Sequence, residues 1–217
     1  MNDIRSYFFI LVLIFGGCSQ KQPSKDQVQI FKPKYTTHVA IKPYHDVSNE
    51  LVELVSKELE EFYHIKTTIL SRGEMPDSCK KPYKKRYNAN KILDYLKFEK
   101  PNDIPFILAL TTKGIATKKE KYDEWGILGL GSRPGPVCVV STANMGKDVE
   151  RLRNRLIKVC LHEMGHNFGL PHCEYGDKRC FMRSAKGTVK TVDEEEKFLC
   201  IQCVAYLQSK GFQMKNS

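Results

Sequence analysis

CLHEMGHNFGLPHCEYGDKRCFM, residues 160–182, holds three of the six histidines and three of the eight cysteines of this 217-residue chain. The histidines are His162, His166 and His172, and Glu163 directly follows the first of them. Imidazole and thiolate are preferred ligands of zinc, and a carboxylate beside such a site can accept a proton. The stretch therefore predicts a metal centre that supports a reaction.

The residues that lead into this stretch have the periodicity of a helix over about 147–169. Hydrophobic residues recur every four positions and form the face expected to enter the core: Leu152, Leu156, Cys160, Met164 and Phe168. Cys160 is thus predicted to be a small buried residue and not a ligand. Gly169 and Pro171 should end the helix, because glycine favours the position after a helix and proline cannot continue its hydrogen bonds.

The helix and the turn after it should bring three imidazoles within reach of one ion. His162 and His166 are four residues apart, so both project from one face of the helix, and His172 returns after the turn. Three imidazoles leave one position of a tetrahedral zinc open for water, as in catalytic sites. The pattern HEMGHNFGLPH also matches HExxHxxGxxH, the metzincin signature, which requires a methionine turn downstream.

The cysteines that follow extend this match to one family. Cys173 directly follows the third histidine, Cys180-Phe-Met182 comes next, and 17 residues later the chain has Cys200-Ile-Gln-Cys203. Over residues 148–207 the pattern resembles that of the archaemetzincins, a family of zinc metallopeptidases in the metzincin clan. One difference is that six residues, EYGDKR, separate Cys173 from Cys180, where the family has four.

The resemblance implies an α+β fold of the zincin or metzincin type. This fold has a mixed twisted sheet, an active-site helix, and a C-terminal helix tied by a four-cysteine zinc site. The catalytic zinc would be bound by three imidazoles: His162, His166 and His172. Glu163 would be the general base, and Met182 the residue of the methionine turn. A second, structural zinc, making two per chain, would be bound by four thiolates: Cys173, Cys180, Cys200 and Cys203.

Two disulfides, Cys173–Cys180 and Cys200–Cys203, are the alternative interpretation of these four cysteines. A disulfide within a CxxC motif is mainly redox-active, and nothing resembling thioredoxin surrounds this one. CxxC is also an ordinary spacing for zinc ligands. The sequence therefore favours zinc and leaves the disulfides open.

The N-terminus has the pattern of an export signal. FFILVLIFGG, residues 8–17, follows Arg5 and is too short to cross a bilayer, but it suits the apolar region of a signal peptide. Gly-Gly-Cys18 resembles the lipidation site of bacterial lipoproteins, although Phe15 stands where that site usually has leucine. An ordinary secretory signal and an uncleaved anchor are the alternatives. We expect a signal at 1–17, a tether at 18–33, one catalytic domain at 34–217, and a protein lipid-anchored through Cys18 in a bacterial cell envelope.

The composition is that of a globular protein, with 41% hydrophobic and 28% charged residues. The net charge of +10 favours acidic partners, such as anionic lipid headgroups, acidic peptides or nucleic acid, and does not choose among them. The basic segment CKKPYKKRYNANK, residues 79–91, is predicted to be a surface loop, and we expect no nucleic-acid binding. GLGSRPG, residues 129–135, resembles a phosphate-binding loop, but no helix follows where one is required.

Hydrophobic patterning predicts the other elements. Strands are expected over residues 36–41, 65–70, 106–110, 125–130 and 137–141. Helices are expected over residues 48–63, 91–96 and 193–208, the first with Ser48 as its N-cap. The strand at 137–141 is expected at the upper edge of the sheet. His38, His45 and His64 have no ligand spacing and are expected to take no part in the chemistry.

We therefore expect a monomeric zinc peptidase whose substrate is a peptide or protein. By analogy with metzincins, the edge strand at 137–141 would pair with that substrate. One alternative is a non-catalytic, zinc-stabilised envelope lipoprotein that only binds peptides, although such a protein has no need of Glu163. A zinc-ribbon protein that binds nucleic acid would explain the charge and the four cysteines, but not the three histidines beside a glutamate.

Overall fold

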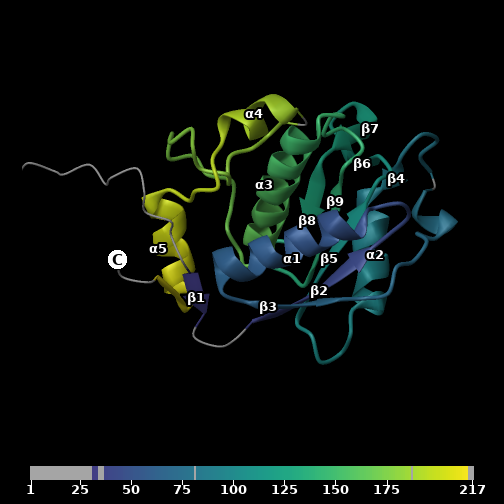
Figure 1. Ribbon diagram of the computed structural model, residues 1–217. Coiled ribbons are helices and arrows are strands. Elements are labelled where there is room, and N and C mark those ends of the chain that lie inside the picture. Colours follow the sequence, from purple (N-terminus) through teal and green to yellow (C-terminus); the bar gives the residue numbers. More distant parts are fainter. Residues whose placement is uncertain (1–30, 34–36, 81, 187, 215–217) are drawn as a thin grey trace, which may run out of the picture.

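A five-stranded mixed sheet lies at the centre of the computed structural model, which describes residues 31–33, 37–80, 82–186 and 188–214 (Figure 1). The strand order is β3-β2-β5-β9-β8. Four strands run parallel: β2 (His38–Pro43), β3 (Lys66–Ile69), β5 (Phe106–Thr111) and β9 (Val137–Ser141). The edge strand β8 (Gly129–Gly131) runs antiparallel to β9. The prediction that 137–141 is the edge strand is therefore wrong, because β8 covers it.

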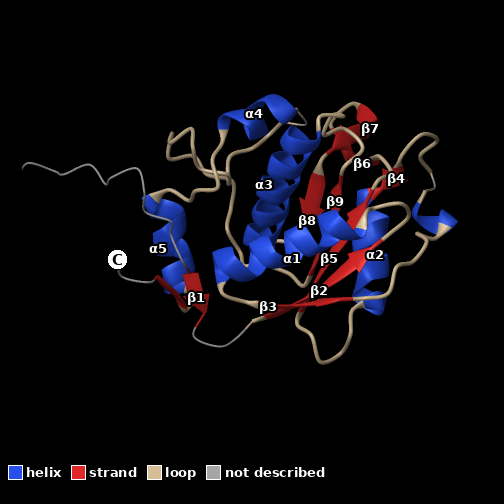
Figure 2. Cartoon of the chain, in the orientation of Figure 1, coloured by secondary structure: helices blue, strands red, loops and turns tan. Residues whose placement is uncertain are grey.

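Helices pack on both faces of this sheet (Figure 2). Because side chains of a strand point alternately to its two faces, β5 sends Leu108 and Leu110 to one hydrophobic cluster and Ile107 and Ala109 to another. The first cluster includes residues of α1 (Asn49–Tyr63) and α3 (Val149–Asn167). The second includes residues of α2 (Ala89–Glu99). Burial on both faces explains the continuous hydrophobic run of residues 106–110.

The helix boundaries follow from local hydrogen bonds. Ser48 caps α1 by accepting a hydrogen bond from the backbone N–H of Leu51, as predicted. Asp148 caps α3 in the same way, with Arg151 N–H at 2.8 Å. Gly169 adopts a positive φ of 101° directly after α3, where a side chain would be strained, and the chain turns there as predicted. Cys160 is buried in the first cluster, which confirms its predicted place in the core.

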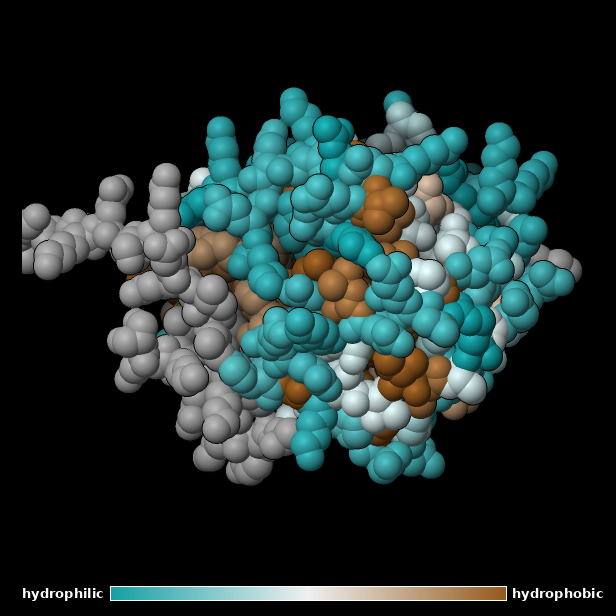
Figure 3. All heavy atoms as spheres, viewed as in Figure 1, coloured by the Kyte–Doolittle hydropathy of each residue, from teal (hydrophilic) through white to brown (hydrophobic). Residues whose placement is uncertain are grey.

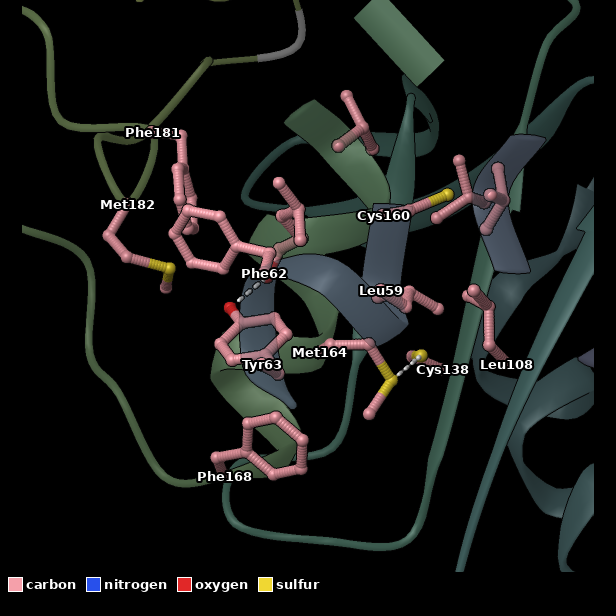
Figure 4. Close-up of a cluster of buried hydrophobic side chains, with 14 of the residues drawn as sticks. Leu59, Phe62, Tyr63, Leu108, Cys138, Cys160, Met164, Phe168, Phe181 and Met182 are labelled. Atoms are coloured by element: carbon pink, nitrogen blue, oxygen red, sulfur yellow. Dashed lines mark hydrogen bonds between the residues drawn. The ribbon is translucent and has the colours of Figure 1, made fainter. Parts of the chain in front are cut away.

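Aromatic side chains join α1, α3 and the turn at residues 181–182 (Figure 4). Tyr63 is fully buried and donates a hydrogen bond to the carbonyl of Leu161 in α3 at 2.8 Å. The ring of Phe62 packs edge-on against Phe181 at 5.3 Å, and Tyr63 packs edge-on against Phe168 at 5.0 Å. Such pairs add stability beyond the area they bury. They hold the turn at 181–182 against α1, which itself packs on the helix that carries the first two histidines.

The region after that turn differs from the prediction. Instead of one helix over 193–208, the chain forms α4 (Val189–Glu194) and α5 (Ile201–Ser209). The backbone between them is engaged elsewhere: Glu196 N–H bonds to the carbonyl of Arg179, and Phe181 N–H bonds to the carbonyl of Phe198. A segment with its hydrogen bonds committed to a neighbouring chain segment cannot continue a helix. Cys200 is thereby placed at the N-terminus of α5.

The smaller elements complete the fold. The sequence did not predict β6 (Ile115–Lys119), which pairs with β7 (Tyr122–Ile127) and β4 (Tyr87–Asn88) in a three-stranded sheet. Only the first two residues of β6 are buried, so the alternating pattern of a strand is too short to recognise. A 3₁₀ turn forms at Asp77–Cys79. The predicted tether ends in β1 (Phe31–Pro33), which pairs with β10 (Phe212–Met214).

Hydrophilic side chains cover most of the face seen in Figure 3, with small hydrophobic areas between them. None of the helices in the described part of the chain is both long and apolar enough to cross a membrane.

Candidate active site

The three predicted histidines come together at the C-terminal half of α3. Their ligand atoms all lie within 4.8 Å of one another. The ring centroids of His162 and His166 are 4.5 Å apart, and His172, which returns after the turn, lies 5.3 and 4.8 Å from them. Bonds of about 2.0–2.1 Å from one zinc ion would span such a group.

Backbone carbonyls orient two of the imidazoles. His162 Nδ1 lies 2.7 Å from the carbonyl oxygen of Phe181, and His166 Nδ1 lies 2.7 Å from that of Leu170. A carbonyl only accepts, so each Nδ1 must carry the proton and donate it. Each Nε2 then has a free lone pair for a metal. This carbonyl contact is the usual support for a histidine ligand.

The imidazoles are neutral near pH 7. Burial lowers the pKa of His162 to about 3 and that of His166 to about 4, and the neighbouring histidines contribute to both shifts. Burial also lowers the pKa of His172. A neutral imidazole keeps the lone pair that a metal requires, whereas a protonated one repels it.

Glu163 is buried against the edge strand β8. Its side chain is 5% exposed, and burial raises its pKa to about 8, an effect opposed by a hydrogen bond from the backbone N–H of Gly131. A Cβ at Gly129 would lie 2.5 Å from Glu163 Oε1, and one at Gly131 would lie 2.8 Å from the Glu163 carbonyl oxygen. Both glycines therefore permit the close approach of β8 to the carboxylate. In the sequence both belong to GLGSRPG, the segment that resembles a phosphate-binding loop, and Gly129 also belongs to the strand predicted over 125–130.

Met182 is fully buried and packs against α3. Its carbonyl accepts a hydrogen bond from Cys173 N–H at 2.7 Å. A Cβ at Gly165 would lie 2.7 Å from Met182 Sδ, so the thioether packs directly against the backbone of α3. Gly165, between Glu163 and His166, is a third positioning glycine, and its role was not predicted from the sequence. The signal available was a glycine in the middle of a helix, where it costs stability unless close packing requires it.

The four predicted cysteines form a second cluster. Their sulfur atoms all lie within 4.8 Å of one another. Cys173 and Cys200 have sulfurs 3.4 Å apart, and the sulfurs of Cys180 and Cys203 are 3.8 Å apart. A tetrahedral zinc with Zn–S bonds of about 2.3 Å separates its sulfurs by roughly 3.8 Å. The six residues between Cys173 and Cys180 do not prevent the four sulfurs from converging.

The electrostatics of this cluster favour a bound cation. The hydrogen bond between Cys180 and Cys203 lowers the pKa of Cys180 to about 6, while burial raises the pKa of Cys173 to about 12. The hydrogen bond with Cys180 raises the pKa of Cys203, and burial adds to that increase. Four crowded thiols cannot all ionise unless a cation compensates them. All seven cysteines in the described residues are free thiols, and the closest sulfurs do not match the alternative pairing of Cys173 with Cys180.

The remaining predicted residues lie elsewhere. Cys18 falls outside the described residues. His38 bonds to Thr68 on the neighbouring strand, and the buried His45 lies 3.0 Å from the hydroxyl of Thr111. His64 ends α1 in a left-handed conformation. None of the three belongs to the histidine cluster.

A cleft of about 490 Å³ opens over the histidines and Glu163. Edge strand β8 forms one wall, and residues 183–186, which follow Met182, form another. Glu195 also lines the cleft, although sequence reasoning assigned it no role. Its side chain is 6% exposed, its Oε1 has no hydrogen-bond partner among the described residues, and burial raises its pKa to about 8.

Comparisons with known proteins agree with this geometry. The model of peptidase family M54 matches residues 35–209. Archaemetzincin of Halobacterium salinarum is 27% identical over 177 residues, covering 76% of this chain and 96% of that protein. Archaemetzincin of Methanopyrus kandleri is 30% identical over 138 residues, covering 63% and 74%. The crystal structure of archaemetzincin from Archaeoglobus fulgidus, complexed with malonate, superimposes with a TM-score of 0.65 at 25% identity, covering 78% and 99%.

These relatives correct the predicted location. The archaemetzincins of Halobacterium, Methanopyrus and Methanocaldococcus are archaeal proteins, so the assignment to a bacterial cell envelope with a lipid anchor is contradicted. That assignment depended only on residues 1–18, which lie outside the described residues. A short apolar run before a cysteine is a weak signal of location, because the pattern is local and depends on no contact with the rest of the fold.

Proposed function

Because this chain belongs to peptidase family M54, the archaemetzincins, whose members are zinc metallopeptidases, we propose that it hydrolyses peptide bonds by the metzincin mechanism. One observation carries the proposal: three neutral imidazoles converge beside a buried carboxylate at the floor of a cleft. The α+β fold with its mixed sheet is the scaffold expected for such a site.

The residues present fit a zinc ion at the histidine cluster. His162 and His166 direct their Nε2 atoms away from the carbonyls that hold Nδ1, and His172 adds a third donor on the exposed side. Three donors leave a position facing the cleft. When bound, zinc supplies Lewis-acid activation of water and of the substrate carbonyl.

Glu163 is the proposed general base. It does not belong to the cluster of ligand atoms, yet it lines the same cleft. The cation expected beside it would lower its pKa from the raised value that burial alone gives, so the carboxylate would be ionised and able to accept a proton. It then passes that proton to the leaving amine. Gly129 and Gly131 keep the carboxylate in place from the β8 side.

The substrate backbone is proposed to pair with β8. This strand is bonded to β9 on one side only, and all three of its residues line the cleft. An extended peptide can add to such an edge through main-chain hydrogen bonds, which would place its carbonyl over the histidines. Pairing with the substrate, which was predicted for the strand at 137–141, is therefore proposed for β8 at 129–131 instead.

A second zinc is proposed at the four cysteines, giving two ions per chain. The sites share one short connection, because His172 and Cys173 are adjacent in the sequence. A zinc at the thiolates would tie this connection to α5 through Cys200 and Cys203. It would thereby fix where His172 meets the two histidines of α3.

The test is metal analysis combined with turnover of a neutral peptide library. We expect two zinc ions per chain, cleavage that stops on treatment with a chelator, and recovery when zinc is restored. A metal-loaded protein that binds peptides without cutting any would instead favour the non-catalytic alternative. The intact Glu163 beside the cluster argues against that alternative, because peptide binding alone does not require it.

A further inference from the structure

Basic side chains surround the cleft in a number that peptide hydrolysis alone does not require. Six of them line it: Lys118, Lys119, Arg133, Lys158, Arg183 and Lys186. The acidic residues lining it are two, Glu163 and Glu195. The lining is therefore positive by four charges even when both carboxylates are ionised, and a bound zinc with neutral ligands would add to this. Low-dielectric walls concentrate such a field within a cleft.

Most of these cations have no carboxylate to neutralise them. Lys118 pairs with Asp123 at 3.4 Å, and Arg183 pairs with Glu194 at 3.7 Å. Across the described ranges, no ion pair within 4 Å involves the other four. Lys158 donates to the carbonyl oxygens of Val192 and Glu195, which orient its ammonium group, and the nearby carboxyl groups of Glu195 and Asp193 offset part of its charge.

The free cations lie on both sides of the histidine cluster. Lys158, His162 and His166 are spaced by four along α3, so they share one face, with Lys158 about 6 Å before the first histidine. Arg133 lies at the other end, two residues after Gly131. A Cβ added to Gly131 would lie 3.3 Å from the Cβ of His166, so this part of the chain lies close to the histidines. Arg133 is exposed to solvent. A substrate placed over the histidines would therefore meet a basic side chain in both directions along the cleft.

We propose that the cleft selects substrates that carry carboxylates close to the scissile bond. This inference rests on the proposed peptidase function and adds its substrate class. The carboxylates have two possible sources: acidic side chains on either side of the cleaved bond, or the free C-terminus of a short peptide. Either would replace the hydration of Arg133, Lys158 or Lys186 with a charge-assisted hydrogen bond. Peptides with lysine at the same positions would be repelled.

The experiment compares matched peptides. A neutral peptide that the wild-type enzyme cuts is varied at each position near the scissile bond to Glu, Gln or Lys, and is made with a free or an amidated C-terminus. We expect kcat/KM for Glu to exceed that for Gln by roughly 1.5- to fivefold, the range for an exposed charge pair at a protein surface. Lys should fall below Gln. A preference only for the free C-terminus would identify that carboxylate as the source.

Variants and salt provide the controls. Arg133→Gln and Lys186→Gln should each reduce the ratio of Glu to Gln, whereas Lys190→Gln should not, because Lys190 is exposed on α4 but outside the cleft. Raising the salt concentration about tenfold should shrink the same ratio. Equal rates for Glu and Gln peptides, or faster cleavage of Lys peptides, would overturn the inference and leave the peptidase function intact.

A binding measurement separates the two proposals if no peptide is cut. Fluorescence anisotropy with zinc-loaded Glu163→Gln should show tighter binding of the Glu peptide than of its Gln counterpart. Equal binding would refute the substrate class. A single-stranded oligonucleotide serves as a competitor in the same measurement. If it displaces the labelled Glu peptide better than unlabelled Glu peptide does, the basic cleft binds nucleic acid, and the proposed substrate class is refuted.

Discussion

Replacing Gly129 with alanine should displace the carboxylate of Glu163 without touching the histidines. A Cβ at this position would lie 2.5 Å from Oε1, 2.7 Å from Cγ and 2.9 Å from Cδ of Glu163. Glu163 is buried and cannot swing into solvent, so either its side chain or strand β8 has to move. The wild-type contact exists only because residue 129 lacks a side chain.

The size of the effect follows from these distances. Non-bonded heavy atoms prefer separations of about 3.5–4.0 Å, so relief of the 2.5 Å contact requires a shift of roughly 1 Å. A catalytic group misplaced by about 1 Å can lose about 100-fold in rate. Overpacking of a buried site costs about 1–3 kcal/mol of stability, which a domain of this size tolerates. We therefore expect kcat/KM to fall about 100-fold in a folded protein that keeps its zinc.

The assay measures peptide cleavage, zinc content and thermal unfolding on the same preparations. Gly126→Ala is the matched control, because it adds the same methyl group in strand β7, where the nearest atoms belong to the side chain of Arg86 at 3.3 Å. This control should keep its activity and its zinc. Wild-type turnover by Gly129→Ala would refute the view that β8 positions Glu163. Loss of zinc from this variant would show that the strand supports the metal and not the base.

Further predictions concern the base, the two metals and the stability. Glu163→Ala should retain zinc and lose about 10²–10⁴-fold in cleavage rate, because it removes the proposed base and no ligand. His166→Ala should lose the catalytic zinc and the activity together. Loss of zinc from both variants would contradict the role of Glu163 as a base. Cys203→Ser should lower the zinc count by one and reduce the Tm, and finding the four thiols oxidised in native protein would exclude that site. Burial raises the pKa of Glu195 to about 8, so the folded state favours the protonated carboxyl group. The resulting contribution to the free energy of unfolding is complete below the unfolded pKa near 4.5 and is lost as the pH rises through about 8. Glu195→Gln should therefore leave the Tm nearly unchanged at pH 4 and raise it relative to wild type at pH 9, and an equal shift at both pH values would exclude this linkage.

The sequence predicted which three histidines lie together in the fold and the helix that carries two of them. The four-residue spacing of His162 and His166 is a property of one helix, and Gly169 ends that helix by its own backbone preference. Both are local, so they can be recognised without knowing what packs nearby. The cysteine spacing likewise indicated four converging sulfurs before any distance was known. The N-terminal pattern, equally local, led to a location that the archaeal relatives contradict.

Which strand borders the site, and what surrounds it, depends on contacts between segments that are distant in the sequence. The order of strands depends on pairing between distant segments, and β8 is too short and too rich in glycine to stand out as an edge strand. Three glycines from two segments, Gly129 and Gly131 in β8 and Gly165 in α3, acquired their roles through atoms brought close by folding. The basic cleft arose in the same way, because its cations come from four separate segments and approach one another only when the chain is folded. Long-range contacts of this kind leave no periodicity in the sequence, and therefore no local pattern predicts them.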